Sequence, residues 1–406
     1  MGFTSQILHS DRRGGVEHGS LHKPVHNAVT FAYDDAHDLA AVFQGKQAGY
    51  SYGRQVNPTV TALQDKISLT EGGVGTAAFS TGMAAIGTTL FSLLRSGDHF
   101  ISSSFLFGNT NSLFNSFAAH GIEVSFVDAT SVDAVAAEIR DNTKIVFVET
   151  IANPRTQVTD LIKIGELCRE HNLVYFVDNT MTTPYLFQPG DVGASLSINS
   201  LTKYIGGHAN ALGGAVTELA NYDWGTFDNI YDIYKKGDVS NWAITQIKKK
   251  GLRDFGASLG PEAAHHISVG SDTLALRMDR ACSNAKSLTD FLVNHPRVKK
   301  VYYPGLEDHP QYELSQSLFK YPGALFSIEL KDLDCFEFLN KLDLVISTSN
   351  LGDTRSLAIP VAHTIYYEMG PERRAEMGID DSLVRFSIGI EEPEDLIADF
   401  EQALGS

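Results

Sequence analysis

The stretch that decides the fold is Asn199-Ser200-Leu201-Thr202-Lys203-Tyr204-Ile205-Gly206-Gly207-His208. It follows the short alternating run 195–198, which is typical of the end of a strand. The stretch places one lysine, Lys203, between small hydroxyl residues and a pair of glycines. A single lysine in such a loop is more often solvated surface than a reactive group. Its interpretation therefore depends on the strands around it.

A second stretch, Leu173-Val174-Tyr175-Phe176-Val177-Asp178, is an apolar run that ends in an aspartate. This pattern is typical of a strand buried in a parallel sheet. Ligands of open parallel sheets bind beyond the carboxyl ends of the strands. We therefore expect Asp178 and Lys203 to lie in the same crevice.

An aspartate and a lysine in one crevice suit pyridoxal phosphate. The lysine would form a Schiff base with the cofactor, and the carboxylate would keep the pyridine nitrogen protonated. Ser200 and Thr202 offer hydroxyl groups for the phosphate. Residues 81–86 add a glycine at the start of a helical pattern, where free N–H groups and the helix dipole favour an anion.

Composition and charge narrow the class of protein. The chain has 406 residues, 43% of them hydrophobic, and a formal net charge of −17. Such an acidic chain is not expected to bind nucleic acid or an anionic membrane. Cys168, Cys282 and Cys335 have no disulfide or metal spacing, so we expect a reducing cytoplasm. We expect no secretory signal and no membrane span.

Strands and helices alternate through the first two thirds of the chain. The apolar patterns predict strands at 99–102, 123–127 and 144–148, and helices at 111–120, 132–140, 161–170 and, further on, 275–293. This rhythm predicts an α/β fold with a mostly parallel sheet and helices on both faces. We divide the chain into an N-terminal arm (1–60), a cofactor-binding domain (61–265, with an insertion near 223–250 that has local helix) and a smaller C-terminal α/β domain (266–406).

Two other kinds of site receive less support. His18, His22 and His26 have helical spacing, but Pro24 would break that helix, so we expect no metal site. Residues 73–78 fit a loose dinucleotide fingerprint, yet the segment before them has a helical rather than a strand pattern. A nicotinamide cofactor is therefore disfavoured.

Six motifs in order resemble one known family between about residues 25 and 404. They are Tyr52-Gly53-Arg54 with Asn57-Pro58-Thr59, Thr81-Gly82-Met83-Ala84-Ala85-Ile86, Glu149-Thr150-Ile151-Ala152-Asn153-Pro154, Asp178-Asn179-Thr180, the Lys203 stretch, and Leu383-Val384-Arg385-Phe386-Ser387. The chain resembles the cysteine/methionine-metabolism (trans-sulfuration) enzymes, which depend on pyridoxal phosphate. That family has the aspartate aminotransferase-like fold type I.

The resemblance implies a role for each matched residue. Lys203 would be the Schiff-base lysine and proton shuttle, Asp178 the partner of the pyridine nitrogen, and Phe107 the residue that stacks on the cofactor ring. Gly82, Met83, Ser200 and Thr202 would hold the phosphate. Tyr52 and Arg54 would reach the cofactor of a neighbouring subunit, in a homotetramer of two active dimers. Arg385, Asn153 and Asn350 would bind the substrate.

Phe107 departs from the family pattern, which has tyrosine at this place. Phenylalanine keeps the stacking surface but lacks the hydroxyl that could protonate a thiolate leaving group. It resembles the O-acylhomoserine sulfhydrylases, whose ester carboxylate leaves without a proton. The resemblance thus implies γ-replacement on O-acetyl- or O-succinylhomoserine by a small thiol, giving homocysteine or cystathionine.

Three alternatives stay open. The first is γ-elimination, as in a methionine or cystathionine γ-lyase. The second is a carbon nucleophile in place of sulfur, and the third is a non-catalytic relative. Two further departures from the family, Ile359-Pro360-Val361 and Val269-Gly270-Ser271, leave the substrate and the nucleophile open.

Overall fold

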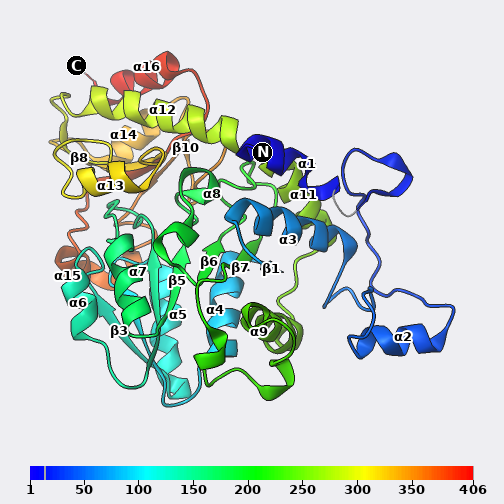
Figure 1. Ribbon diagram of the computed structural model, residues 1–406. Coiled ribbons are helices and arrows are strands. Elements are labelled where there is room, and N and C mark those ends of the chain that lie inside the picture. Colours follow the sequence, from blue (N-terminus) through cyan, green and yellow to red (C-terminus); the bar gives the residue numbers. More distant parts are fainter. Residues whose placement is uncertain (13–14, 406) are drawn as a thin grey trace.

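The structure is a computed structural model that describes residues 1–12 and 15–405. Two sheets divide it into a large α/β domain and a smaller C-terminal domain (Figure 1). The large sheet has the strand order β1-β7-β6-β5-β4-β2-β3. Its strands are β1 (Gly75–Phe79), β2 (His99–Ser103), β3 (Glu123–Val127), β4 (Thr143–Glu149), β5 (Val174–Asp178), β6 (Leu196–Asn199) and β7 (Gly214–Glu218). Strands β2 to β6 run parallel, and β7 is antiparallel to both neighbours, which confirms the mostly parallel sheet.

Helices cover both faces of the large sheet, as the continuous apolar strands predict. On β4, Val146 and Val148 point to one buried cluster, whereas Ile145 and Phe147 point to another. Each such buried side chain contributes roughly 1.5–3 kcal/mol. The helices of this domain are α3 (Pro58–Glu71), α4 (Gly82–Leu93), α5 (Gly108–Ser116), α6 (Val132–Ala137), α7 (Leu161–Glu170), α8 (Thr183–Leu186), α9 (Trp242–Gln246), α10 (Arg253–Phe255) and α11 (Pro261–Ser271).

The C-terminal domain has a five-stranded sheet in the order β10-β11-β12-β9-β8. Its strands are β8 (Val298–Tyr302), β9 (Leu325–Leu330), β10 (Ile346–Ser347), β11 (Leu357–Pro360) and β12 (Leu383–Ser387). Its helices are α12 (Leu274–Leu292), α13 (Tyr312–Leu318), α14 (Cys335–Lys341), α15 (Gly370–Glu376) and α16 (Pro393–Leu404). Apolar residues of α12, α14 and α16 share one buried cluster with this sheet.

The N-terminal segment carries α1 (Phe3–His9) and α2 (Ala36–Phe43). In Figure 1 the blue segment around α2 extends away from the rest of the molecule. Helix α2 buries none of its residues, and Phe43 is 67% exposed. Asn57 connects this segment to the start of α3. Its Nδ2 donates to the His26 carbonyl at 2.7 Å, and its Oδ1 caps the helix.

Two predicted helices differ from the structure, whereas the local helix expected in region 223–250 is present. The helix expected over 111–120 ends at Ser116 and continues as a 3₁₀ turn, and the helix expected over 132–140 ends at Ala137. Region 223–250 combines 3₁₀ turns, α9 and the start of a π-helix, Ile247–Leu252. Its buried aromatic and aliphatic residues join the cluster beneath α4, so tertiary packing rather than a regular period shapes it.

Candidate active site

The candidate site lies where β4, β5 and β6 end side by side. Glu149 and Asp178 are register partners at the ends of β4 and β5. Ser200 directly follows β6, and Lys203 lies in the turn after it. The parallel arrangement thus brings the predicted aspartate and lysine to the same edge of the sheet.

A residue of the C-terminal domain, Asn350, binds the Lys203 side chain. Its Nζ donates a hydrogen bond to Asn350 Oδ1 at 2.7 Å. Burial, together with the positive charge of Arg385, lowers the pKa of Lys203 to about 8. A neutral amine is therefore accessible near physiological pH, as a nucleophile or a base needs.

Asp178 and Glu149 form a pair of carboxyl groups with little solvation. Burial raises the pKa of both groups, and the charge of Asp178 raises that of Glu149 further. Backbone N–H groups hold the pair: Thr180 donates to Asp178 at 2.9 Å, and Phe107 donates to Glu149 at 3.1 Å. Across residues 1–12 and 15–405, neither carboxyl group has a salt bridge.

These two carboxyl groups are hydrogen-bond acceptors that suit a cationic N–H group. Like charges at close range disfavour a doubly ionised pair unless a cation lies beside them. A protonated pyridine nitrogen supplies such a charge, so the residues present fit pyridoxal phosphate.

A cradle for an anion lies at the start of α4. Thr81 caps the helix by accepting from the Ala84 N–H at 3.0 Å, which leaves the N–H groups of Gly82 and Met83 without a helical acceptor. A Cβ on Gly82 would lie 2.9 Å from the Ser200 Cβ, so only glycine allows this approach. Such a helix start binds phosphate well.

Thr202 contributes differently from Ser200. Its hydroxyl donates to the Gly213 carbonyl at 3.2 Å and accepts from the Gly213 N–H at 3.0 Å. In this arrangement the hydroxyl proton of Thr202 is already donated to the Gly213 carbonyl. Thr202 can thus only accept, while Ser200 keeps a hydroxyl that can donate to an anion.

Arg385 is the buried cation of the site. It is 1% exposed, and burial lowers its pKa to about 10. Its guanidinium donates to the Asn350 carbonyl at 2.8 Å and to Asn153 Oδ1 at 3.4 Å, while its Nε has no partner in the described part of the chain. A guanidinium with unused donors and no paired carboxylate fits a substrate carboxylate.

Tyr52 and Arg54 are not joined to the rest of the site within one chain. Tyr52 is 38% exposed, and Arg54 lies 5.4 Å from the centre of its ring. Among the described residues, no hydrogen bond connects either side chain to Lys203 or Asp178. Both are therefore available to another molecule.

Two buried residues that the sequence analysis did not select support the site. Glu71, at the end of α3, accepts hydrogen bonds from the amides of Asn179 (3.3 Å) and Asn199, which flank the ends of β5 and β6. Burial raises the pKa of Glu71 to about 7. Arg277 on α12 donates to the carbonyls of Tyr204 (2.6 Å) and Ile205 (3.2 Å), directly after Lys203.

A signal for Glu149 was present in the sequence, because it ends an apolar strand just as Asp178 ends the next one. No comparable signal marks Glu71 or Arg277, whose partners lie more than 70 residues away in the chain. Residues 73–75 follow helix α3 and lead into the edge strand β1, so the context of a dinucleotide site is absent there. No helix of the described chain is long and apolar enough to cross a membrane.

The fold and this site define a fold type I enzyme dependent on pyridoxal phosphate. The family described as Cys/Met metabolism PLP-dependent enzyme matches residues 4–405. The chain therefore belongs to this family, whose members carry out γ-replacement and γ-elimination.

Individual relatives carry several activities. An L-methionine gamma-lyase of Fusobacterium nucleatum subsp. nucleatum is 39% identical, over 95% of this chain and 94% of its own. An O-acetyl-L-homoserine sulfhydrylase of Corynebacterium glutamicum is 33% identical, over 98% and 96%. A solved O-acetylhomoserine (thiol)-lyase of Campylobacter jejuni, with a pyridoxyl-lysine monophosphate, superposes with a TM-score of 0.94 at 31% identity over all of both chains.

Proposed function

We propose that the chain catalyses γ-replacement on an O-acylhomoserine, with a small sulfur nucleophile as acceptor. The observation that carries this proposal is Phe107. Its backbone N–H bonds Glu149, so it lies beside the carboxyl pair, and its side chain has no proton to give to a leaving group. An acyl carboxylate needs no such proton, whereas a thiolate leaves less readily without one.

The chain's own residues would act as follows. Pyridoxal phosphate, when bound, supplies an electron sink for charge that develops on the substrate carbon. Arg385 binds and orients the substrate carboxylate, and Lys203 Nζ removes the proton from Cα and later returns one. Asn350 holds Lys203 by its amide oxygen and Arg385 by its carbonyl, so one residue sets the distance between base and clamp.

The proposed assembly is a tetramer of two active dimers. The exposed segment around α2, with Phe43 on its surface, fits a contact with a neighbouring subunit. Tyr52 and Arg54 would then complete the phosphate site of that neighbour. The proposed domains are an arm (1–60), a cofactor-binding domain (61–265) and a C-terminal domain (266–406). The proposed location is a reducing cytoplasm, which the three buried free cysteines fit.

Replacing Arg385 by Lys tests the carboxylate clamp. The ammonium keeps the charge but loses the planar fork, so kcat/KM should fall by roughly 100-fold, mostly through a higher KM. Steady-state kinetics measure the change, and circular dichroism checks the fold. A variant with unchanged KM would remove Arg385 from substrate binding.

The pKa of Lys203 sets how fast the cofactor-free protein takes up pyridoxal phosphate. With a pKa near 8, the neutral amine is about 1% of the total at pH 6, about 10% at pH 7 and about half at pH 8. The rate constant for uptake, followed by absorbance in stopped flow, should therefore rise about tenfold from pH 6 to pH 7 and level off above pH 8. A rate still rising tenfold per pH unit above pH 9 would indicate an ordinary lysine.

The second candidate function is γ-elimination on methionine or cystathionine. The specific observation in its favour is that two methionine gamma-lyases of Fusobacterium nucleatum are 39% identical to the chain, above the 33% of the sulfhydrylase. The two reactions share proton removal and loss of the γ-substituent. They differ in whether a thiol or water completes the turnover.

One assay distinguishes the two functions. Release of 2-oxobutanoate is measured from O-acetyl- and O-succinylhomoserine with and without sulfide, beside L-methionine alone. Replacement predicts that sulfide suppresses the oxo acid while homocysteine accumulates. Rapid formation of 2-oxobutanoate from methionine without an acceptor would instead indicate the lyase. The interpretation of Phe107 would then be wrong.

A further inference from the structure

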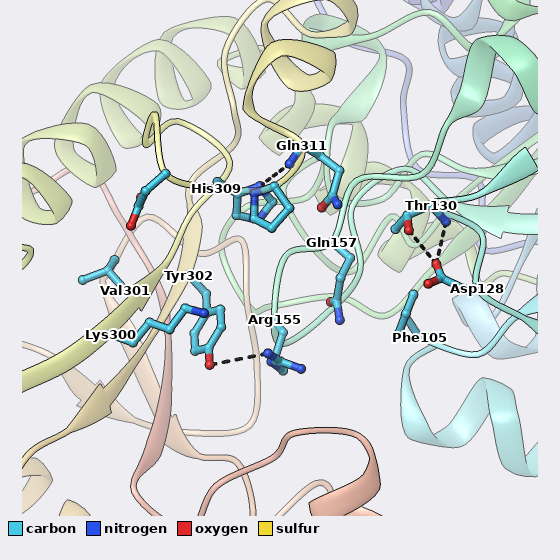
Figure 2. Close-up of a pocket in the computed structure, with 12 residues that line it drawn as sticks. Phe105, Asp128, Thr130, Arg155, Gln157, Lys300, Val301, Tyr302, His309 and Gln311 are labelled. Carbon is cyan, nitrogen blue, oxygen red and sulfur yellow. Dashed lines mark hydrogen bonds between the residues drawn. The ribbon is translucent and has the colours of Figure 1, made fainter.

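A cavity of about 220 Å³ lies between the two domains, apart from Lys203, Asp178 and Arg385, none of which lines it. One wall comes from the loops that follow β2, β3 and β4, and the other comes from β8 and the loop after it. Because the strand order is β5-β4-β2-β3, the cavity lies on the β3 side of the carboxyl pair. It is therefore a pocket along the domain boundary that residues of both domains line (Figure 2).

Two cations lie on either side of Tyr302 in this cavity. The Arg155 guanidinium carbon and the Lys300 Nζ are each 4.8 Å from the ring centre. Neither side chain has a carboxylate within 4.0 Å in the described part of the chain. Arg155 donates to the Met377 carbonyl at 3.0 Å and to the Tyr302 hydroxyl at 3.5 Å, and neither acceptor is a carboxylate. The cations thus have unused capacity for a carboxylate.

An acid and two amides complete the polar lining. Asp128 accepts from the backbone and hydroxyl of Thr130 through Oδ1 alone, at 2.9 and 2.6 Å, which leaves Oδ2 for another donor. The side-chain amides of Gln157 and Gln311 have no hydrogen bond within the described residues. Figure 2 shows Asp128 across the pocket from Lys300 and Tyr302, with Gln157 between them. The two signs of charge are therefore separated across the space.

Two further titratable groups line the cavity. Burial lowers the pKa of His309 to about 4, so His309 is neutral near pH 7. Asp308 is an exposed second acid. The lining therefore combines two positive and two negative charges. Such a balance suits a ligand with both signs better than a simple anion.

We propose that this cavity binds a free α-amino acid as a zwitterion. Arg155 and Lys300 hold the carboxylate, Asp128 holds the ammonium group, and the amides face the side chain. The volume falls below the roughly 300–1,000 Å³ of sites for drug-sized ligands, which suits a small metabolite. This inference goes beyond the proposed function, since no residue that lines the cavity has a role in the proposed reaction.

The occupant would connect the domains, because Asp128 and Arg155 belong to one and Lys300 and Gln311 to the other. Arg155 lies two residues after Asn153, which accepts from Arg385. Binding in the cavity would therefore act on the position of the substrate clamp, and it should change KM more than kcat.

Calorimetric titration of the borohydride-reduced holoenzyme tests the proposal, because reduction fixes the cofactor to its lysine and prevents turnover. The probes are L-methionine and L-glutamine. We expect one saturable site per chain, and at least tenfold weaker binding of N-acetyl-L-methionine and of L-methioninamide, which each lack one charge. No saturable binding, or equal binding of either single-charge analogue, would overturn the proposal.

Variants locate the site. Arg155→Met and the milder Asp128→Asn should each weaken binding of both amino acids at least tenfold. Arg297→Met, which removes an arginine outside the cavity, should leave it unchanged. Because Asp128 is exposed, its amide variant should fold normally even if Arg155→Met does not. Wild-type affinity in Asp128→Asn, or equally weakened binding in Arg297→Met, would overturn the assignment.

Discussion

Replacing Lys203 by Ala should lower turnover of an O-acylhomoserine by about 10⁴-fold or more, because it removes the amine, held by Asn350, that is proposed to move the Cα proton. The variant should still bind pyridoxal phosphate through the phosphate cradle and the carboxyl pair. Its absorbance should then be that of the free aldehyde rather than of a lysine adduct. Steady-state assays and absorbance spectra measure both results.

Lys331→Ala is the matched control, since Lys331 is exposed and lies on the C-terminal domain. It should keep wild-type kinetics and the wild-type spectrum. Near-normal turnover in Lys203→Ala would reject Lys203 as the reactive lysine and, with it, the proposed mechanism.

Replacing Asp178 by Asn should lower kcat by about 10²–10³-fold, because a neutral amide no longer favours a protonated pyridine nitrogen. The change is nearly isosteric, and the Thr180 N–H can still donate to the amide oxygen, so the fold should persist. The charge of Asp178 is also one reason why the pKa of Glu149 is raised. Removing that charge should lower the pKa of Glu149, although burial, the larger cause of its raised pKa, remains.

Asp191→Asn serves as the comparison, because Asp191 is exposed and lies in the 3₁₀ turn that leads into β6, at the opposite end of that strand from Ser200. It should change neither kcat nor the pH profile. An unchanged kcat in Asp178→Asn would contradict the assigned role.

The sequence predicted those parts of the site that follow from local patterns. Asp178 and Lys203 were found because strand ends of a parallel sheet converge, and the end of one strand can be seen in a short run of residues. The C-terminal site residues needed the family resemblance, because Arg385 meets Asn153 across 232 positions of the chain. No periodicity predicts such a contact.

The regions that were predicted poorly have a common physical cause. Region 223–250 has no regular period because its apolar residues fit the space beneath α4 in 3₁₀ and π turns. Glu71 was overlooked because its importance depends on two amides that lie 108 and 128 positions away. The strand order of the second sheet likewise depends on tertiary pairing that a single strand does not reveal.

Helix α3 connects the N-terminal segment that carries α2 to the candidate active site. At one end, Asn57 fastens the helix to the segment that carries α2, and at the other end Glu71 holds the amides beside both catalytic strand ends. The 14 residues form a rod of about 21 Å. In the proposed assembly, a neighbouring subunit would hold the segment at the outer end of this rod, so that contact and the placement of Asp178 and Lys203 would be coupled through one helix.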